Sequence, residues 1–175
     1  EARPYALIIF VTREGAPMVN MERIASFSVN HDTLQKGMYI SRIDGDVVTY
    51  DIRMKRPNEG DYVSNEALHT FEHLFATYAR NSGLSDKVIY IGPMGCRTGF
   101  YLLMRDTATG QQAIDLARES FAFIVDYEGD IPGAEHSECG NYKEHDLEAA
   151  KAVAGDMMEV LRDWNEERLD YDYKG

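Results

Sequence analysis

The first part of the chain shows the two-residue alternation of apolar and polar side chains that is typical of strands. Residues 25–29 alternate apolar side chains with serine, which predicts a half-buried strand. Two further apolar runs, at 38–43 and 47–54, are separated only by Gly45 and its two aspartate neighbours. Because glycine adopts a positive φ without steric cost, this turn predicts a β-hairpin.

The period then lengthens to three and four residues, which predicts helices. The first helix spans about 65–81, with Ser64 or Asn65 as its N-cap and Gly83 as its stop. A second helix and a final helix, which begins near the N-cap Asp146, each carry one apolar face. The residues of these two faces are Ala113, Leu116, Ala117, Ser120, Phe121 and Ile124, and then Leu147, Ala150, Ala154, Met157, Leu161 and Trp164. Core packing is the favoured interpretation of the last face, and a subunit interface is the alternative.

Two more strands are predicted between the first two helices. They cover 87–91 and 100–105, on either side of a turn that contains Cys96. The predicted order is three strands, one helix, two strands and two helices, which lacks the alternation of a parallel βαβ fold. We therefore expect an α+β fold, with a mostly antiparallel sheet and helices packed on one face.

The chain divides into a short N-terminal segment and one domain. Residues 1–20 hold one strand-like run followed by polar, turn-prone residues, and Met21 would be a natural start for the remaining domain. The segment is an N-terminal extension, a remnant of cloning, a start assigned too early or an additional edge strand, and these alternatives stay open. Residues 21–175 have the length of a single domain with its own hydrophobic core.

Composition and charge exclude several classes of partner. The chain is 44% hydrophobic and 27% charged, and 30 acidic against 18 basic residues give it a formal net charge of -12. Such a surface repels nucleic acid and anionic membranes. No apolar run approaches the ~20 residues of a transmembrane helix, and no signal peptide is visible. We therefore expect a cytoplasmic protein without a nucleic-acid or membrane partner.

The chain has two cysteines, Cys96 and Cys139. A protein of this size does not need a disulfide to stabilise its core, and both cysteines lie in settings that suit reactive thiolates. We therefore expect them to be free.

One helical segment is a candidate for metal binding, and two surface histidines beside a solvated glutamate are the alternative. His69 and His73 are four residues apart and stack on one face of the first helix, with Glu72 beside them, as in the H-x-x-E-H motif of inverted zinc peptidases. Cys139 is a candidate third ligand, and a thiolate with two imidazoles suits Zn or Fe(II) while leaving a fourth position open. His136 and Glu138 are weaker candidates. His145 is interpreted as a capping or surface residue.

A second candidate for chemistry is Cys96. It lies in the turn Pro93-Met94-Gly95-Cys96-Arg97-Thr98-Gly99, where glycines let the backbone approach a ligand closely. The adjacent cation Arg97 favours a thiolate. A buried structural cysteine is the alternative.

Together these motifs resemble those of the LuxS-type S-ribosylhomocysteine lyases. The resemblance covers about 21–162 and depends on three motifs in the same order as in the family. They are His69-Thr70-Phe71-Glu72-His73-Leu74, the Cys96 turn continued through Phe100-Tyr101, and Cys139-Gly140-Asn141-Tyr142. Smaller similarities are Ser26-Phe27, His31, Asp51-Ile52-Arg53 and Arg56-Pro57-Asn58.

The resemblance implies a LuxS-like metalloenzyme fold and a role for each residue of these motifs. His69, His73 and Cys139 would be the ligands of an Fe(II) ion, for which Zn or Co can substitute. Glu72 and Cys96 would be the catalytic acid/base residues.

The resemblance also implies a substrate site shared between two subunits. Ser26, His31 and Arg53 would lie around S-ribosylhomocysteine, some of them contributed by the second subunit of a homodimer. The products would be homocysteine and 4,5-dihydroxy-2,3-pentanedione, the precursor of the quorum-sensing signal autoinducer-2.

The implied chemistry explains the residue types. The carbonyl of the ribose must move along the sugar until it is β to the carbon that bears sulfur. Each move removes a proton next to a carbonyl, which a Lewis-acidic metal assists and which Glu72 and Cys96 can carry out. The chain departs from many members at Tyr90 and Gly92, where the family has an acidic residue and a serine, and this departure concerns the sugar contacts.

Two other functions are compatible with parts of the pattern. A metallopeptidase would use Glu72 to activate water and would normally have a carboxylate as third ligand, but it would leave Cys96 without a role. A metal-dependent sensor that has lost catalysis is the second alternative, and Tyr90 is its only support.

Overall fold

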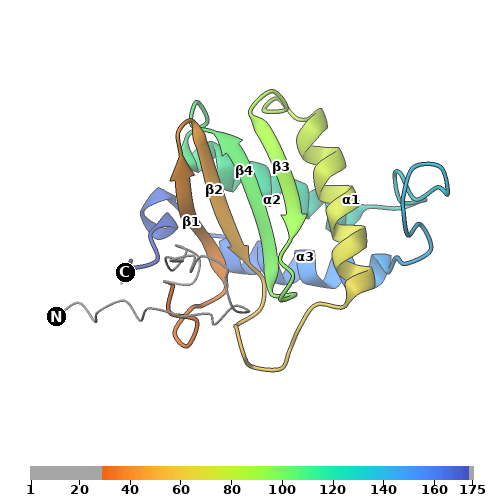
Figure 1. Ribbon diagram of the computed structural model, residues 1–175, viewed down its shortest axis with the longest axis horizontal. Coiled ribbons are helices and arrows are strands. Elements are labelled where there is room, and N and C mark those ends of the chain that lie inside the picture. The colour runs from red at the N-terminus through yellow and green to blue at the C-terminus, as the bar shows by residue number, and fades with distance from the viewer. Residues whose placement is uncertain (1–28, 174–175) are drawn as a thin grey trace, which may run out of the picture.

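The computed structural model describes residues 29–173, which form a four-stranded antiparallel sheet and a layer of helices (Figure 1). One hairpin contains β1 (Gly37–Asp44) and β2 (Val47–Arg53), and a second contains β3 (Val88–Pro93) and β4 (Gly99–Arg105). The two hairpins join through β2 and β4, so the strand order is β1-β2-β4-β3. The predicted α+β class and antiparallel sheet are confirmed.

Three long helices cover one face of the sheet. Figure 1 shows α2 (Gly110–Asp126) and α3 (Leu147–Leu161) behind the strands and α1 (Asn65–Asn81) beside β3. A short 3-10 helix, η2 (Glu166–Leu169), follows α3. No helix lies on the opposite face within the described residues, which matches the expectation of helices on one side.

The sheet register sorts side chains between these two faces. Met38, Ile52 and Phe100 lie opposite one another on three strands, and each is 0% exposed on the helix side. Gly45 has a φ of 60°, as the predicted β1–β2 hairpin requires. The register shifts at Ser41, where an extra residue forms a bulge in β1.

An aromatic cluster fixes α1 against the sheet. The ring centroids of Phe71 and Phe100 are 5.1 Å apart, and Phe121 of α2 lies 5.3 Å from Phe71. Phe75 completes the cluster, 5.5 Å from Phe121. Residues two apart on a helix project about 200° from each other. The phenylalanines at 71 and 75 therefore direct residues 69 and 73 away from the core.

The caps of α1 agree with the sequence at its beginning and differ at its end. Ser64 is the N-cap, and its hydroxyl accepts a hydrogen bond from the amide of Ala67 at 3.2 Å. Gly83 does not end the helix. The chain instead leaves α1 at Ser82 in an extended conformation, with its amide bonded to the carbonyl of Ala79, so no left-handed glycine is needed.

The final helix begins at the predicted N-cap Asp146 but is shorter than its apolar stripe. It ends at Leu161, so Trp164 is not on the helix. The Arg118 guanidinium donates hydrogen bonds to the carbonyls of Leu161 and Trp164, which takes up terminal acceptors that further helical turns would have used. The Trp164 indole instead donates to the carbonyl of Met38 at 2.9 Å. Core packing of the stripe is confirmed, because Ala150, Ala154, Met157 and Leu161 are fully buried.

Some sequence predictions lie outside the described residues. They concern the segment 1–20, most of the strand at 25–29, and Ser26. Among the described helices, none is both long and apolar enough to cross a membrane.

Two isoleucines of the first hairpin give a matched test of the packing. Ile52 is 0% exposed and Ile43 is 61% exposed. We expect Ile52→Ala to lower the free energy of unfolding by about 2–5 kcal/mol, because it leaves a cavity under the helices. Ile43→Ala should change it by about 0.5 kcal/mol or less. Urea denaturation measures both, and equal losses would contradict the assigned register.

Candidate metal centre and reactive cysteine

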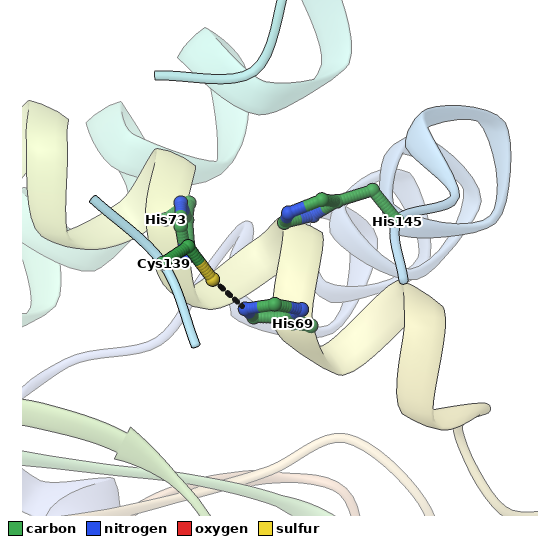
Figure 2. Close-up of side chains that lie close together, drawn as sticks. All are labelled: His69, His73, Cys139 and His145. Atoms are coloured by element: carbon green, nitrogen blue, oxygen red, sulfur yellow. Dashed lines mark hydrogen bonds between the residues drawn. The ribbon is translucent and has the colours of Figure 1, made fainter. Parts of the chain in front are cut away.

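Four side chains from distant parts of the chain converge beside α1. His69 and His73 come from the helix, Cys139 from the loop between α2 and α3, and His145 from the residue before the α3 N-cap (Figure 2). Each offers one ligand atom, and these atoms all lie within 4.8 Å of one another. All four side chains are partly buried. This is the spacing of ligands around a single ion.

Backbone carbonyls orient the two helix histidines. The Nδ1 of His69 is 2.8 Å from the carbonyl oxygen of Glu144, and the Nδ1 of His73 is 2.7 Å from that of Pro132. A carbonyl only accepts, so each Nδ1 carries the proton and each Nε2 keeps a free lone pair. This arrangement is the usual outer support of metal-binding histidines. The donor set therefore fits a metal ion.

The thiol of Cys139 completes the set of donors. Its Sγ lies 3.2 Å from the Nε2 of His69, as the dashed line in Figure 2 marks. The amide of Asn141 donates to the same sulfur at 3.4 Å, which stabilises negative charge there. A thiolate and imidazoles form a soft set that suits Zn or Fe(II).

The interpretation of His145 as a capping or surface residue is wrong. Asp146 is the cap, and the His145 ring stacks on His69 with centroids 4.2 Å apart. Its Nδ1 is 3.1 Å from the Thr70 hydroxyl, while its buried Nε2 has no hydrogen-bond partner among the described residues. Burial, and then the nearby charges of His69 and His73, lower the pKa of His145. The sequence places His145 directly before the N-cap of α3, and the packing of α3 on α1 brings this position to the ligand cluster.

The other two candidates in the Cys139 loop are not part of the cluster. His136 is exposed and lies against Tyr142, with ring centroids 5.5 Å apart. Glu138 is exposed and lines a neighbouring cleft without joining the ligand group.

Glu72 lies where two clefts meet. One, of about 330 Å³, is bounded by His69, Glu72, Asn141 and the Met94–Gly95 part of the turn. The other, of about 500 Å³, is bounded by Glu72, both helix histidines and Cys139. A small molecule in these clefts would contact Glu72, the ligand cluster and the Cys96 turn together.

The turn that carries Cys96 is tight and strained. The amide of Met94 donates to the carbonyl of Gly99, and that of Arg97 donates to Met94, both at 2.8 Å. Arg97 has a φ of 60°, a left-handed conformation that costs about 1–3 kcal/mol in a residue other than glycine. The turn leaves Cys96 exposed, with its Sγ 3.0 Å from the Thr98 hydroxyl. The alternative of a buried structural cysteine is wrong, and no disulfide joins Cys96 to Cys139.

The cation that hydrogen bonds connect to Cys96, through the Thr98 hydroxyl, is Arg53 and not the neighbouring Arg97. The Arg97 guanidinium lies over the Tyr62 ring, 5.6 Å from its centroid. Arg53 is only 3% exposed and donates to the Thr98 hydroxyl at 2.5 Å. Burial opposes the charge of Arg53, but the attraction of Asp51 and its hydrogen bonds raise the pKa overall.

The residues expected to contact the substrate do not all lie near the ligand cluster or the Cys96 turn. Of the three expected around a substrate, Arg53 lies near Cys96, whereas His31 lies outside the ligand cluster and both clefts. The Nδ1 of His31 is 2.9 Å from the carbonyl oxygen of Val29. Tyr90 is 52% exposed, and its ring covers Gly92 so closely that a Cβ there would overlap it. The two departures from the family pattern are therefore one coupled feature.

The fold and the cluster together define a class of protein. It is an α+β protein whose first helix presents two imidazoles, which converge with a thiol from the loop between α2 and α3 in a set suited to a metal ion. A family model described as S-ribosylhomocysteinase (LuxS) matches residues 24–168. The chain belongs to the LuxS family, as the resemblance in its motifs indicated.

The chain covers nearly the whole length of several similar proteins. One from Clostridium acetobutylicum is 47% identical over 156 residues, which are 86% of this chain and 99% of the relative. One from Phocaeicola vulgatus is 46% identical over 160 residues, or 88% and 99%. One from Porphyromonas gingivalis is 46% identical over 157 residues, or 86% and 99%. All three carry the name S-ribosylhomocysteine lyase.

Metal content tests the cluster. We expect His73→Ala to reduce the metal bound per chain to about a tenth or less, because one of the converging donors is lost. His136→Ala, in the exposed loop, should keep the wild-type content. Elemental analysis of protein purified under identical conditions measures both. Equal metal in the two variants would show that an ion is held elsewhere.

Proposed function

We propose that this chain is an S-ribosylhomocysteine lyase, a metal-dependent enzyme that releases homocysteine from a ribosyl substrate. The observation that carries the proposal is the position of Glu72 in two clefts, one bounded also by His69 and the Cys96 turn and the other by His69, His73 and Cys139. Membership of the LuxS family and the names of relatives at 43–47% identity support it. Residues 21–175 would form a single catalytic domain.

His69, His73 and Cys139 would hold the metal. We propose Fe(II), with Zn or Co as substitutes, because a mixed nitrogen and sulfur set accepts all three. When bound, the ion supplies a Lewis acid that polarises the sugar carbonyl. The hydrogen bonds to Glu144 and Pro132 keep both imidazoles in the required tautomer.

Glu72 and Cys96 would carry the protons. The carbonyl moves along the ribose by loss of a proton from the carbon beside it and delivery of a proton to carbon or oxygen. Glu72 borders the cleft of about 330 Å³ from α1, and the Cys96 turn borders the same cleft from the end of β3. Two groups on different sides of one substrate can act on neighbouring carbons in turn. Removal of a last proton then expels homocysteine as the leaving thiol.

Thr98 and Arg53 would support Cys96. The Thr98 hydroxyl lies 3.0 Å from the cysteine sulfur and accepts a hydrogen bond from the buried Arg53 guanidinium. A hydroxyl whose oxygen accepts from a cation donates more strongly through its own proton. Thr98 is therefore oriented to donate to a thiolate at Cys96.

The elimination leaves a five-carbon product, 4,5-dihydroxy-2,3-pentanedione, the precursor of autoinducer-2. We place the reaction in the cytoplasm, where free thiols such as Cys96 and Cys139 stay reduced. Neither nucleic acid nor a membrane is expected to take part, given the net charge of -12.

We also propose that two chains associate through the sheet face that no described helix covers. Thr49, Leu103 and Tyr90 form a row on this face, and the Tyr90 side chain is 52% exposed. An unpartnered sheet face with apolar side chains favours contact with a second copy. A second subunit would bring Ser26 and His31 toward the substrate.

The lyase reaction is tested by thiol release. We expect Glu72→Gln and Cys96→Ala each to lower the rate of homocysteine release by about 10²–10⁴, because each removes a proton-transfer group. Glu148→Gln, an exposed change on α3, should keep the wild-type rate. A thiol reagent follows the release from metal-loaded protein given S-ribosylhomocysteine. Unchanged rates in both site variants would exclude the assigned roles, provided that their metal contents match.

The association of two chains has its own test. We expect Leu103→Arg to convert a dimer into a monomer, because it places a charge in the apolar contact. Ile43→Arg, at the end of the hairpin and outside this row, should leave the dimer intact. Sedimentation equilibrium measures the mass. A wild-type protein that is monomeric at all concentrations would contradict the proposed interface.

A further inference from the structure

The segment after α3 returns to the sheet and places Tyr171 against it. The Tyr171 ring stacks on Tyr39 of β1, with centroids 4.7 Å apart and planes 18° from parallel. Its hydroxyl donates a hydrogen bond of 2.8 Å to the Oδ2 of Asp51 on β2. The family model ends at residue 168, so Tyr171 is not part of the matched pattern.

Asp51 connects Tyr171 to a buried cation. The Arg53 guanidinium donates to both oxygens of Asp51, at 3.1 and 2.6 Å, while the two side chains are only 3% and 2% exposed. The same guanidinium donates to the Thr98 hydroxyl, which lies 3.0 Å from the Cys96 sulfur. One unbroken series of hydrogen bonds thus runs from Tyr171 to Cys96.

We propose that Tyr171 is a positioning residue for Cys96, acting through Asp51, Arg53 and Thr98. The Asp51 carboxylate divides its acceptor capacity between the phenol and the guanidinium. The phenol neutralises part of the carboxylate charge, so more of the Arg53 field is left to act on the sulfur. Loss of the phenol would strengthen the hold of Asp51 on Arg53 and weaken the stabilisation of a thiolate.

Several other hydroxyl groups surround Asp51 and Arg53, but Tyr171 differs from them in its hydrogen bonding. Tyr39 on β1 and Tyr101 on β4 also face Asp51 and Arg53, and Ser41 faces Tyr171. Among the described residues, the Tyr171 hydroxyl is the only one of these four that donates to Asp51. Burial first, and then the Asp51 charge, raise the pKa of Tyr39, Tyr101 and Tyr171. All three phenols are therefore neutral at neutral pH.

The proposal deepens the proposed function, because it matters for catalysis only if Cys96 transfers protons. Its test nevertheless needs no ribosyl substrate. Alkylation of Cys96 by iodoacetamide reports the thiolate directly. Peptide mass spectrometry can follow Cys96 separately from Cys139. A failure of the lyase reaction and a failure of this inference are thus distinguishable.

The first variant is Tyr171→Phe, which removes the hydroxyl and keeps the ring stacked on Tyr39. We expect Cys96 alkylation at neutral pH to be about threefold slower, since one hydrogen bond to a charged network is lost. The alkylation profile between about pH 5 and about pH 9 should move to higher pH. Tyr173→Phe is the matched control, because this phenol of the same segment is 41% exposed and its hydroxyl makes no hydrogen bond in the described part.

A second pair of variants tests the route. Thr98→Val keeps the shape of the side chain and removes the hydroxyl between Arg53 and Cys96. In this background, we expect Tyr171→Phe to have little further effect on alkylation, as for two members of one network. An equal effect in both backgrounds would overturn the route through Thr98. A Tyr171→Phe protein that melts earlier but has the wild-type alkylation profile would show that Tyr171 only anchors the segment, and the proposal would be wrong.

Discussion

The packing of α1 on the sheet is the constraint on which the site depends. Phe71 and Phe75 insert between Phe100 and Phe121 and fix the rotation of the helix about its axis. Since residues two positions apart point in nearly opposite directions, the same packing fixes where His69 and His73 point. A helix free to rotate by one residue, about 100°, would no longer direct both imidazoles toward the Cys139 loop.

Loops supply the rest of the centre, and backbone carbonyls fasten them. The carbonyls of Pro132 and Glu144 accept from the two imidazoles of α1, so the same hydrogen bonds that set the tautomers also attach the long loop to the helix. Thr70, one residue after His69, accepts from the amide of Asp146 and contacts the ring of His145. The positions of the metal ligands therefore depend on the same contacts that dock α3 on α1.

Much of the fold and part of the candidate site could be predicted from the sequence, because local patterns determine these features. The i and i+4 histidines, the Gly45 hairpin, and the caps Ser64 and Asp146 each depend on a few neighbouring residues, and each is found as predicted. What the sequence did not reveal depends on tertiary contacts. Arg97 is adjacent to Cys96 in the chain, yet strand pairing brings Arg53 to its turn instead. His145 gave no periodic signal, because its place is set by how α3 meets α1.

Asp51 and Arg53 form a buried ion pair whose hydrogen bonds extend beyond the pair itself. Burying two charges costs several kcal/mol of desolvation per ion, and a pair of apolar residues at these positions would often be as stable. Here each charge has partners beyond the pair: Tyr171 donates to Asp51, and Arg53 donates to Thr98. The pair therefore sits between a C-terminal segment and a reactive thiol. A buried cation that is bound by Asp51 and also donates to Thr98 in the Cys96 turn places positive charge near that sulfur more reliably than the exposed Arg97 could.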